Sequence, residues 1–172
     1  MIENKTLQRY EFKYFLSKKI SNEIKNHIRK FMIIDKFANN FSDKNYFVRS
    51  IYFDNEFNSN FDEKVDGHRI RKKFRLRYYD KDLKKSPIFL ETKGRNLERT
   101  YKRRVKLDLE DFDLIVKDTS LNNLLEKYPN SLTIQDFVFE YYKKKLKPKV
   151  LIDYSREPFV NKHGLYFRLT FD

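Results

Sequence analysis

The chain has 172 residues, enough for one domain with its own core and too few for two domains of ordinary size. It has no cysteine, which excludes disulfides and thiolate metal sites, and its 38 Lys and Arg against 25 Asp and Glu give a formal net charge of +13. No stretch approaches the roughly 18 apolar residues of a membrane-spanning helix. We therefore expect a single cytoplasmic domain over residues 1–172, with no membrane segment in this chain. A membrane-bound partner stays open.

The first half of the chain predicts strands interrupted by two helical patches. Residues 8–16 alternate polar and aromatic side chains, which is typical of a strand with one polar and one aromatic face. Ser17 is a suitable N-cap for a helix whose isoleucines fall on one stripe. The further elements expected here are strands over residues 45–54, 69–80, 87–93 and 99–109, with a short helix or loop over 57–66.

The second half predicts two helices followed by two strands. The helices cover residues 110–128 and 131–147, and each ends before a proline, Pro129 and Pro148. The strands cover residues 149–156 and 163–172. Because hairpin-like strands fill the middle of the chain and helices flank them, the sequence predicts an α+β fold with an antiparallel sheet.

Cations gather in the middle of the chain, where residues 69–106 hold 16 Lys and Arg against 4 acids. Successive side chains of a strand point to opposite faces, so these cations separate from the apolar residues of the same strands. Those that share a face are Arg71, Lys73, Arg75, Arg77, Lys93, Lys102, Arg104 and Lys106. Like charges on adjacent strands destabilise each other, and a solvated face normally mixes both signs. The pattern therefore favours a sheet curled into a barrel whose lumen holds an anion.

Two carboxylates, Glu11 and Glu91, are predicted on these cationic faces. A carboxylate among cations either bridges two of them or holds a divalent metal that sits on phosphate oxygens. Both roles stay open for Glu11, and the ion-pair role is preferred for Glu91. Arg offers a planar fork for phosphate oxygens and Lys a compact charge, so a channel lined with both is suited to a chain of phosphates.

Seven segments in chain order resemble the VTC domain, the polyphosphate polymerase module of the triphosphate tunnel metalloenzyme (CYTH-like) superfamily. The segments are RYEFKY (9–14), VRSIYFD (48–54), RKKFRLRYYD (71–80), LETKGR (90–95), YKRR (101–104), DYSREPF (153–159) and FRLTFD (167–172). The resemblance implies an antiparallel β-barrel, or tunnel, with flanking helices. It also implies that the tunnel binds triphosphate or polyphosphate with Mn²⁺ or Mg²⁺, and that the γ-phosphate of ATP is transferred to polyphosphate.

The resemblance also implies roles for individual residues. The catalytic group would be Arg75, Arg77 and Lys93. The phosphate-binding group would be Lys13, Lys102, Arg104, Arg156 and Arg168, where Lys102 and Arg104 compete for one role and Lys102 is preferred. In the family a further segment with a metal-binding glutamate follows the last of these strands. We therefore expect a chain that lacks the last strands, a tunnel closed in another way, or a protein that binds without turnover.

Other functions stay open beside phosphate transfer to polyphosphate. The same tunnel could hydrolyse triphosphate, polyphosphate or a nucleoside triphosphate with water as acceptor, or bind polyanions without catalysis. A nucleic-acid interface is disfavoured, because the aromatic side chains mostly oppose the basic ones, whereas stacking on bases needs both on one face. The expected partners are ATP, triphosphate and polyphosphate, with no nucleic acid, and the sequence sets no oligomeric state.

Overall fold

The computed structural model describes residues 10–117, 120–164 and 167–172. The chain divides into two compact units, which we describe separately. Of the described residues, unit 1 takes in residues 10 and 11 and those within Arg49–Ile152, and unit 2 takes in those within Phe12–Val48 and Asp153–Asp172. The expectation of one domain over the whole chain stays a prediction.

The sheet of unit 1 is an antiparallel meander, as the sequence predicts. It consists of β3 (Ile70–Tyr78), β4 (Ile88–Asn96), β5 (Arg99–Leu107) and the second part of β2 (Tyr46–Asp54). The connections from β3 to β4 and from β4 to β5 are short, with the 3-10 helix η2 (Leu83–Lys85) in the first of them. In β3 the alternation is confirmed, because Phe74, Leu76 and Tyr78 are buried in the core, and Lys73, Arg75 and Arg77 alternate with them on the opposite face.

In its described residues unit 1 has four α-helices: α2 (Ser59–Val65), α3 (Leu109–Val116), α4 (Asn122–Lys127) and α5 (Leu132–Lys144). The single helix predicted over residues 110–128 is therefore wrong, since two helices occupy this range. They are joined by the buried carboxylate of Asp111, which accepts hydrogen bonds from Lys127 Nζ at 2.9 Å and Tyr128 Oη at 2.6 Å. This carboxylate satisfies partners on both helices and so fixes them against each other.

The end of α5 also differs from the prediction. The helix stops at Lys144 because Lys145 takes a left-handed conformation, with φ 55° and ψ 52°, that caps it. Strand β6 (Lys147–Asn161) then begins before Pro148, so this proline lies in a strand and does not terminate the helix. The signal for the helix end is thus the residue after the helix and not the proline.

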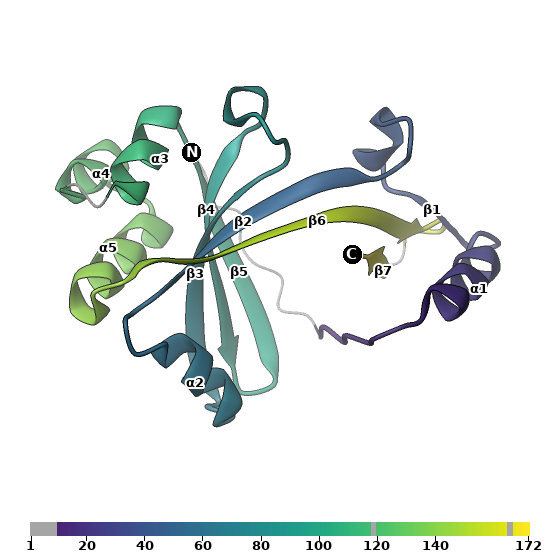
Figure 1. Ribbon diagram of the computed structural model, residues 1–172, viewed down its shortest axis with the longest axis horizontal. Coiled ribbons are helices and arrows are strands. Elements are labelled where there is room, and N and C mark those ends of the chain that lie inside the picture. The colour runs from purple at the N-terminus through teal and green to yellow at the C-terminus, as the bar shows by residue number, and fades with distance from the viewer. Residues whose placement is uncertain (1–9, 118–119, 165–166) are drawn as a thin grey trace. The chain divides into compact units, whose positions relative to one another are not determined.

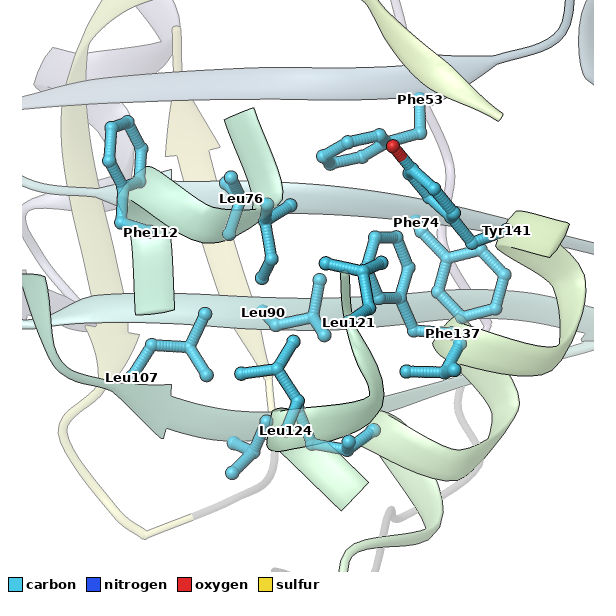
Figure 2. Packing of buried hydrophobic residues seen from close by; sticks show 14 of the residues in the cluster. Phe53, Phe74, Leu76, Leu90, Leu107, Phe112, Leu121, Leu124, Phe137 and Tyr141 are labelled. Carbon is cyan, nitrogen blue, oxygen red and sulfur yellow. The ribbon is translucent and has the colours of Figure 1, made fainter. Parts of the chain in front are cut away.

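The hydrophobic core of unit 1 lies between the sheet and the helices α3, α4 and α5, which gather on one side of β3–β5 (Figure 1). The ring of Phe137 on α5 packs against Phe53 of β2 and Phe74 of β3, with centroids 5.1 and 5.4 Å away (Figure 2). Leu76 and Leu90 are fully buried in the same cluster. One face of the sheet is thus committed to packing, which leaves the other face for the cations.

Gly94 of β4 is required by a close approach of two strands. It lies opposite Tyr101 of β5, and a Cβ atom at Gly94 would stand 2.0 Å from the ring of that tyrosine. Two non-bonded carbon atoms do not approach so closely, so any side chain at this position must displace the tyrosine ring. The glycine of the LETKGR segment therefore serves the packing of the sheet.

Unit 2 contains α1 (Lys18–Ile28), β1 (Met32–Ile34), the 3-10 helix η1 (Ala38–Asn40), β7 (Arg168–Phe171) and the first and last parts of β2 and β6 respectively. β6 pairs with both β1 and β7 in antiparallel register. Its small core is formed by Ile28, Met32 and Phe159. The predicted cap of α1 is confirmed, because Ser17 Oγ accepts a hydrogen bond from Ile20 N at 3.3 Å.

The strand predicted over residues 8–16 is wrong for its described part. Residues 10–16 form no strand, and Phe12 and Tyr14 are exposed by about three quarters of their surface. Alternation alone does not make a strand, because a strand also needs a partner for its backbone groups. Residues 8 and 9 lie outside the described residues. The last predicted strand, 163–172, is shorter than expected and covers Arg168–Phe171.

The predicted fold class is confirmed. The strand order is β1-β6-β2-β3-β4-β5 with β7 on β6, and the paired strands are antiparallel. An antiparallel sheet with flanking helices is an α+β fold and is consistent with a tunnel-like architecture. None of the helices within the described ranges is long and apolar enough to cross a membrane.

Candidate functional site

Nine side chains of unit 1 form a regular grid on the face of β3–β5 that points away from the helices. The strand registers align them in three rows across the three strands. The rows are Lys73–Lys93–Lys102, Arg75–Glu91–Arg104 and Arg77–Phe89–Lys106. Seven of the nine are cations, one is an acid and one is a phenylalanine. We call these nine residues the cationic face.

This face concentrates positive charge in a small area. Adjacent strands lie about 4.8 Å apart and alternate residues of one strand about 7 Å apart, so neighbouring cations stand within that range of each other. Two like charges about 6 Å apart repel by roughly 3 kcal/mol at an effective dielectric constant of about 20. A face with seven cations therefore gains stability from any anion that lies across it.

Glu91 occupies the centre of the cationic face and is fully buried. Its Oε2 accepts hydrogen bonds from Arg75 at 2.7–2.8 Å and lies 3.8 Å from Arg77 Nε, and its Oε1 lies 2.5 Å from Lys102 Nζ. A buried carboxylate is tolerated only when it is paired in this way. Glu91 thus acts as a bridge between cations of two strands, the role preferred from the sequence.

The surroundings shift the pKa values of this cluster. Burial alone would raise the pKa of Glu91, but Arg75, Lys102 and Arg77 outweigh it, and the pKa lies below its ordinary value. Burial lowers the pKa of Lys102 to about 8, against the opposing attraction of Glu91. Burial also lowers the pKa of Lys73. The lysines are therefore held in a setting where an added anion would favour their charged form.

Two residues of β2 extend the site, and the sequence did not single them out as binding residues. Arg75 Nη1 donates to Tyr52 Oη at 2.7 Å, and Arg77 Nε donates to Ser50 Oγ at 3.0 Å. Each hydroxyl lies directly opposite the arginine that it contacts in the β2–β3 register. The alternation of β2 could have placed both on one face, but the register that brings them to β3 is not visible in a single sequence.

Cations on the other side of the same strands are neutralised by a helix. Lys72 Nζ lies 3.5 Å from Asp136 and 3.2 Å from Glu140, and Arg103 also pairs with Asp136. Both acids come from α5, which covers that side. The contrast with the cationic face indicates that its excess of charge is a property of one face and not of basic composition alone.

Comparison with known proteins identifies a family for the chain. The family model of the VTC domain matches residues 8–172, essentially the whole chain. The chain belongs to the VTC domain family. A search of curated proteins found no match. VTC domains are associated with a polyphosphate polymerase type of function, and the family suggests polyphosphate-related partners.

The predicted site residues of this VTC domain fall into two groups. Unit 1 brings together Arg75, Arg77, Lys93, Lys102 and Arg104, all on the cationic face, with Glu91 among them. Unit 2 holds the other three predicted phosphate ligands. Their convergence with the cationic face stays a prediction.

Two of the three predicted phosphate ligands of unit 2, Arg156 and Arg168, have anionic partners in the structure. Arg156 donates to both carboxylate oxygens of Asp172 at 2.5 Å, in the two-pronged geometry that a phosphate also accepts. Arg168 Nη2 lies 3.4 Å from Asp35. Lys13 lies in the exposed segment of residues 10–16. The carboxylates show that these arginines are positioned to bind oxyanions.

The VTC domain offers few ligands for a metal ion. In the described ranges no group of three or more His, Cys, Asp or Glu could hold one. Glu91 is committed to three cations, and both oxygens of Glu11 contact Lys93 Nζ, at 2.7 and 3.0 Å. A divalent ion usually needs several oxygen ligands, which can include those of a bound phosphate chain. The described residues therefore do not form a metal site on their own.

Proposed function

We propose that this chain binds ATP and polyphosphate on the cationic face and transfers the γ-phosphoryl group of ATP to the terminal oxygen of a polyphosphate chain, with release of ADP. The observation that carries the proposal is the three-by-three grid, in which seven cations surround one carboxylate. A chain of phosphates matches such a surface, because its oxygens are spread along its length.

Phosphoryl transfer requires mostly positioning and charge neutralisation from the protein. Arg75 and Arg77 would hold the terminal phosphates, since their guanidinium groups are fixed by Glu91, Tyr52 and Ser50. Lys93 and Lys102 would neutralise the charge that develops on the transferred group. Arg156 and Arg168 would bind the accepting chain. Lys13 would add a phosphate contact, and Arg104 stays the alternative to Lys102 for the role that the two residues share.

We include a divalent metal, Mn²⁺ or Mg²⁺, in the proposal as an ion that arrives on the phosphate chain. Its chemistry would be to neutralise charge on phosphate oxygens. Glu11 is the carboxylate suited to reach it, because this side chain is half-exposed and its present partner is a lysine of the site.

A cytoplasmic location likewise stays a prediction.

Product analysis tests the proposal. The protein is incubated with ATP and Mn²⁺, with and without a polyphosphate primer, and the products are separated on a gel. Polyphosphate ladders are the expected result. Free phosphate without ladders would indicate the hydrolase, and tight binding of triphosphate without turnover would indicate a binding module. Efficient competition by single-stranded DNA would instead point to nucleic acid.

A further inference from the structure

Phe89 is the uncharged member of the cationic face, and core packing does not account for it. Its neighbours along β4, Ile88 and Leu90, point into the hydrophobic core, whereas Phe89 shares the opposite face with Glu91. In the third row of the grid its partners are Arg77 and Lys106. Burial of apolar surface therefore does not explain why a half-buried aromatic ring lies between two cations on this face.

The side chain of Arg104 turns toward this ring. Arg104 stands directly opposite Glu91 in the strand register, yet its Cζ atom lies 4.7 Å from the centroid of Phe89. Lys102, from the neighbouring row, contacts Glu91 Oε1 instead. Tyr79 meets the same ring edge-on, with centroids 6.2 Å apart and planes at 68°. The ring of Phe89 is thus held by Tyr79 and lies beside the exposed guanidinium of Arg104.

We propose that Phe89 and Arg104 form a stacking platform for the base of a nucleoside triphosphate, a subsite that inorganic phosphate chains leave unused. The inference rests on the proposed function, since it places the phosphates on the cations around Glu91. Aromatic rings and guanidinium planes both stack on nucleobases, and they do so with little dependence on the identity of the base.

The spacing of the two subsites suits a nucleotide. Phe89 is two residues from Glu91 on β4, which corresponds to about 7 Å along the strand. A ribose can bridge the separation between Phe89 and the row of Glu91, so the base reaches the platform while the phosphates stay on Arg75 and Lys102, with Arg77 beside the platform, opposite Phe89 in the register. The platform therefore provides a physical means to distinguish the phosphate donor, a nucleotide, from the acceptor, which has no base.

The test compares two ligands on one variant. Phe89→Leu keeps the apolar volume and removes the ring, and isothermal titration measures the affinity for ATP and for inorganic triphosphate under the same salt and metal conditions. We expect Phe89→Leu to lower the affinity for ATP by about tenfold and to change the affinity for triphosphate by less than about twofold, because stacking acts only on the base. Phe89→Trp should keep the affinity for ATP. Phe139→Leu, at an exposed position of α5, is the matched control and should change the affinity for neither ligand.

Several results would overturn the platform. If Phe89→Leu leaves both affinities unchanged, the ring does not contact the base. If both affinities fall equally, Phe89 supports the cations and not a nucleotide. In either case wild-type binding of triphosphate would still uphold the phosphate site. Wild-type protein that binds neither ligand would overturn the proposed function itself, and the platform with it.

Discussion

Lys102 Nζ lies 2.5 Å from Glu91 Oε1, and yet the pKa of this lysine is lowered to about 8 from an ordinary 10.5. Burial is the largest cause, and Arg75 and Arg77 lower the pKa further against the attraction of Glu91. The ion pair thus does not offset the cost of charging Lys102 in its surroundings. The cationic face holds a lysine whose charge depends on what else is bound.

This relationship predicts proton uptake on ligand binding. A bound phosphate chain should raise the pKa of Lys102, so the protein should take up a proton when triphosphate binds near pH 8. Titrations in two buffers with different heats of ionisation measure the uptake. Lys102→Arg, which stays charged throughout, should remove it. An uptake of the same size in Lys102→Arg would assign it to another group.

The same pKa shift predicts how stability depends on pH without ligand. The folded pKa lies below the unfolded one, so between about pH 8 and 10.5 the unfolded chain binds more protons. The contribution of Lys102 therefore makes the protein more stable as pH rises through this window. Urea unfolding at several pH values compares wild type with Lys102→Gln, and equal slopes in the two would contradict the prediction.

Removal of the central carboxylate should destabilise the fold and increase its response to ligand. In Glu91→Gln the cations around the site lose their fixed counter-charge, and we expect a loss of about 3 kcal/mol in the free energy of unfolding. Triphosphate should then raise the melting temperature of Glu91→Gln more than that of wild type. A smaller rise would mean that Glu91 has a direct part in ligand binding, such as a metal contact.

Glu11 competes with a phosphate group for Lys93 in this account. Its carboxylate contacts Lys93 Nζ through both oxygens, so Glu11→Gln should tighten metal-free binding of triphosphate, by about threefold for an exposed pair of this kind. Calorimetry with a chelator present measures this. Weaker binding in the variant would show that the carboxylate helps to hold the ligand.

The core of unit 1 should depend on the ring of Phe137. Phe137→Ala removes contacts with Phe53 and Phe74 at the centre of the packed face, and we expect a loss of about 3–5 kcal/mol in unfolding free energy. Chemical denaturation measures it. Phe139→Ala, two residues along the same helix and exposed, is the control and should cost far less.

Much of this arrangement could be predicted from the sequence, because it depends on the two-residue period of strands. That period separated Arg75 and Arg77 from Phe74 and Leu76, and it placed Glu91 among the cations. The registers between strands could not be predicted in this way. The contacts of Ser50 and Tyr52 with the arginines depend on them, as does the turn of Arg104 toward Phe89.

The predictions that failed relied on local pattern where other contacts decide the structure. Residues 10–16 alternate like a strand, but they form no strand in the structure. The helix predicted over 110–128 is divided into two helices, which are joined by Asp111. This residue is buried, whereas a charged side chain is normally expected at the surface. Lys145 ends α5 in a left-handed conformation that favours glycine or asparagine, so a lysine at this position does not predict the end of the helix.

The most direct test of the cationic face compares two variants, Arg77→Gln and Lys117→Gln, in their affinity for inorganic triphosphate. Both variants lose one positive charge, but Arg77 lies in the grid, and Lys117 is an exposed residue at the end of α3 that pairs with Asp113. Calorimetry should show about a 10- to 100-fold loss for Arg77→Gln, the value of a charged hydrogen bond, and little change for Lys117→Gln. Equal affinities in the two folded variants would contradict a phosphate site on this face.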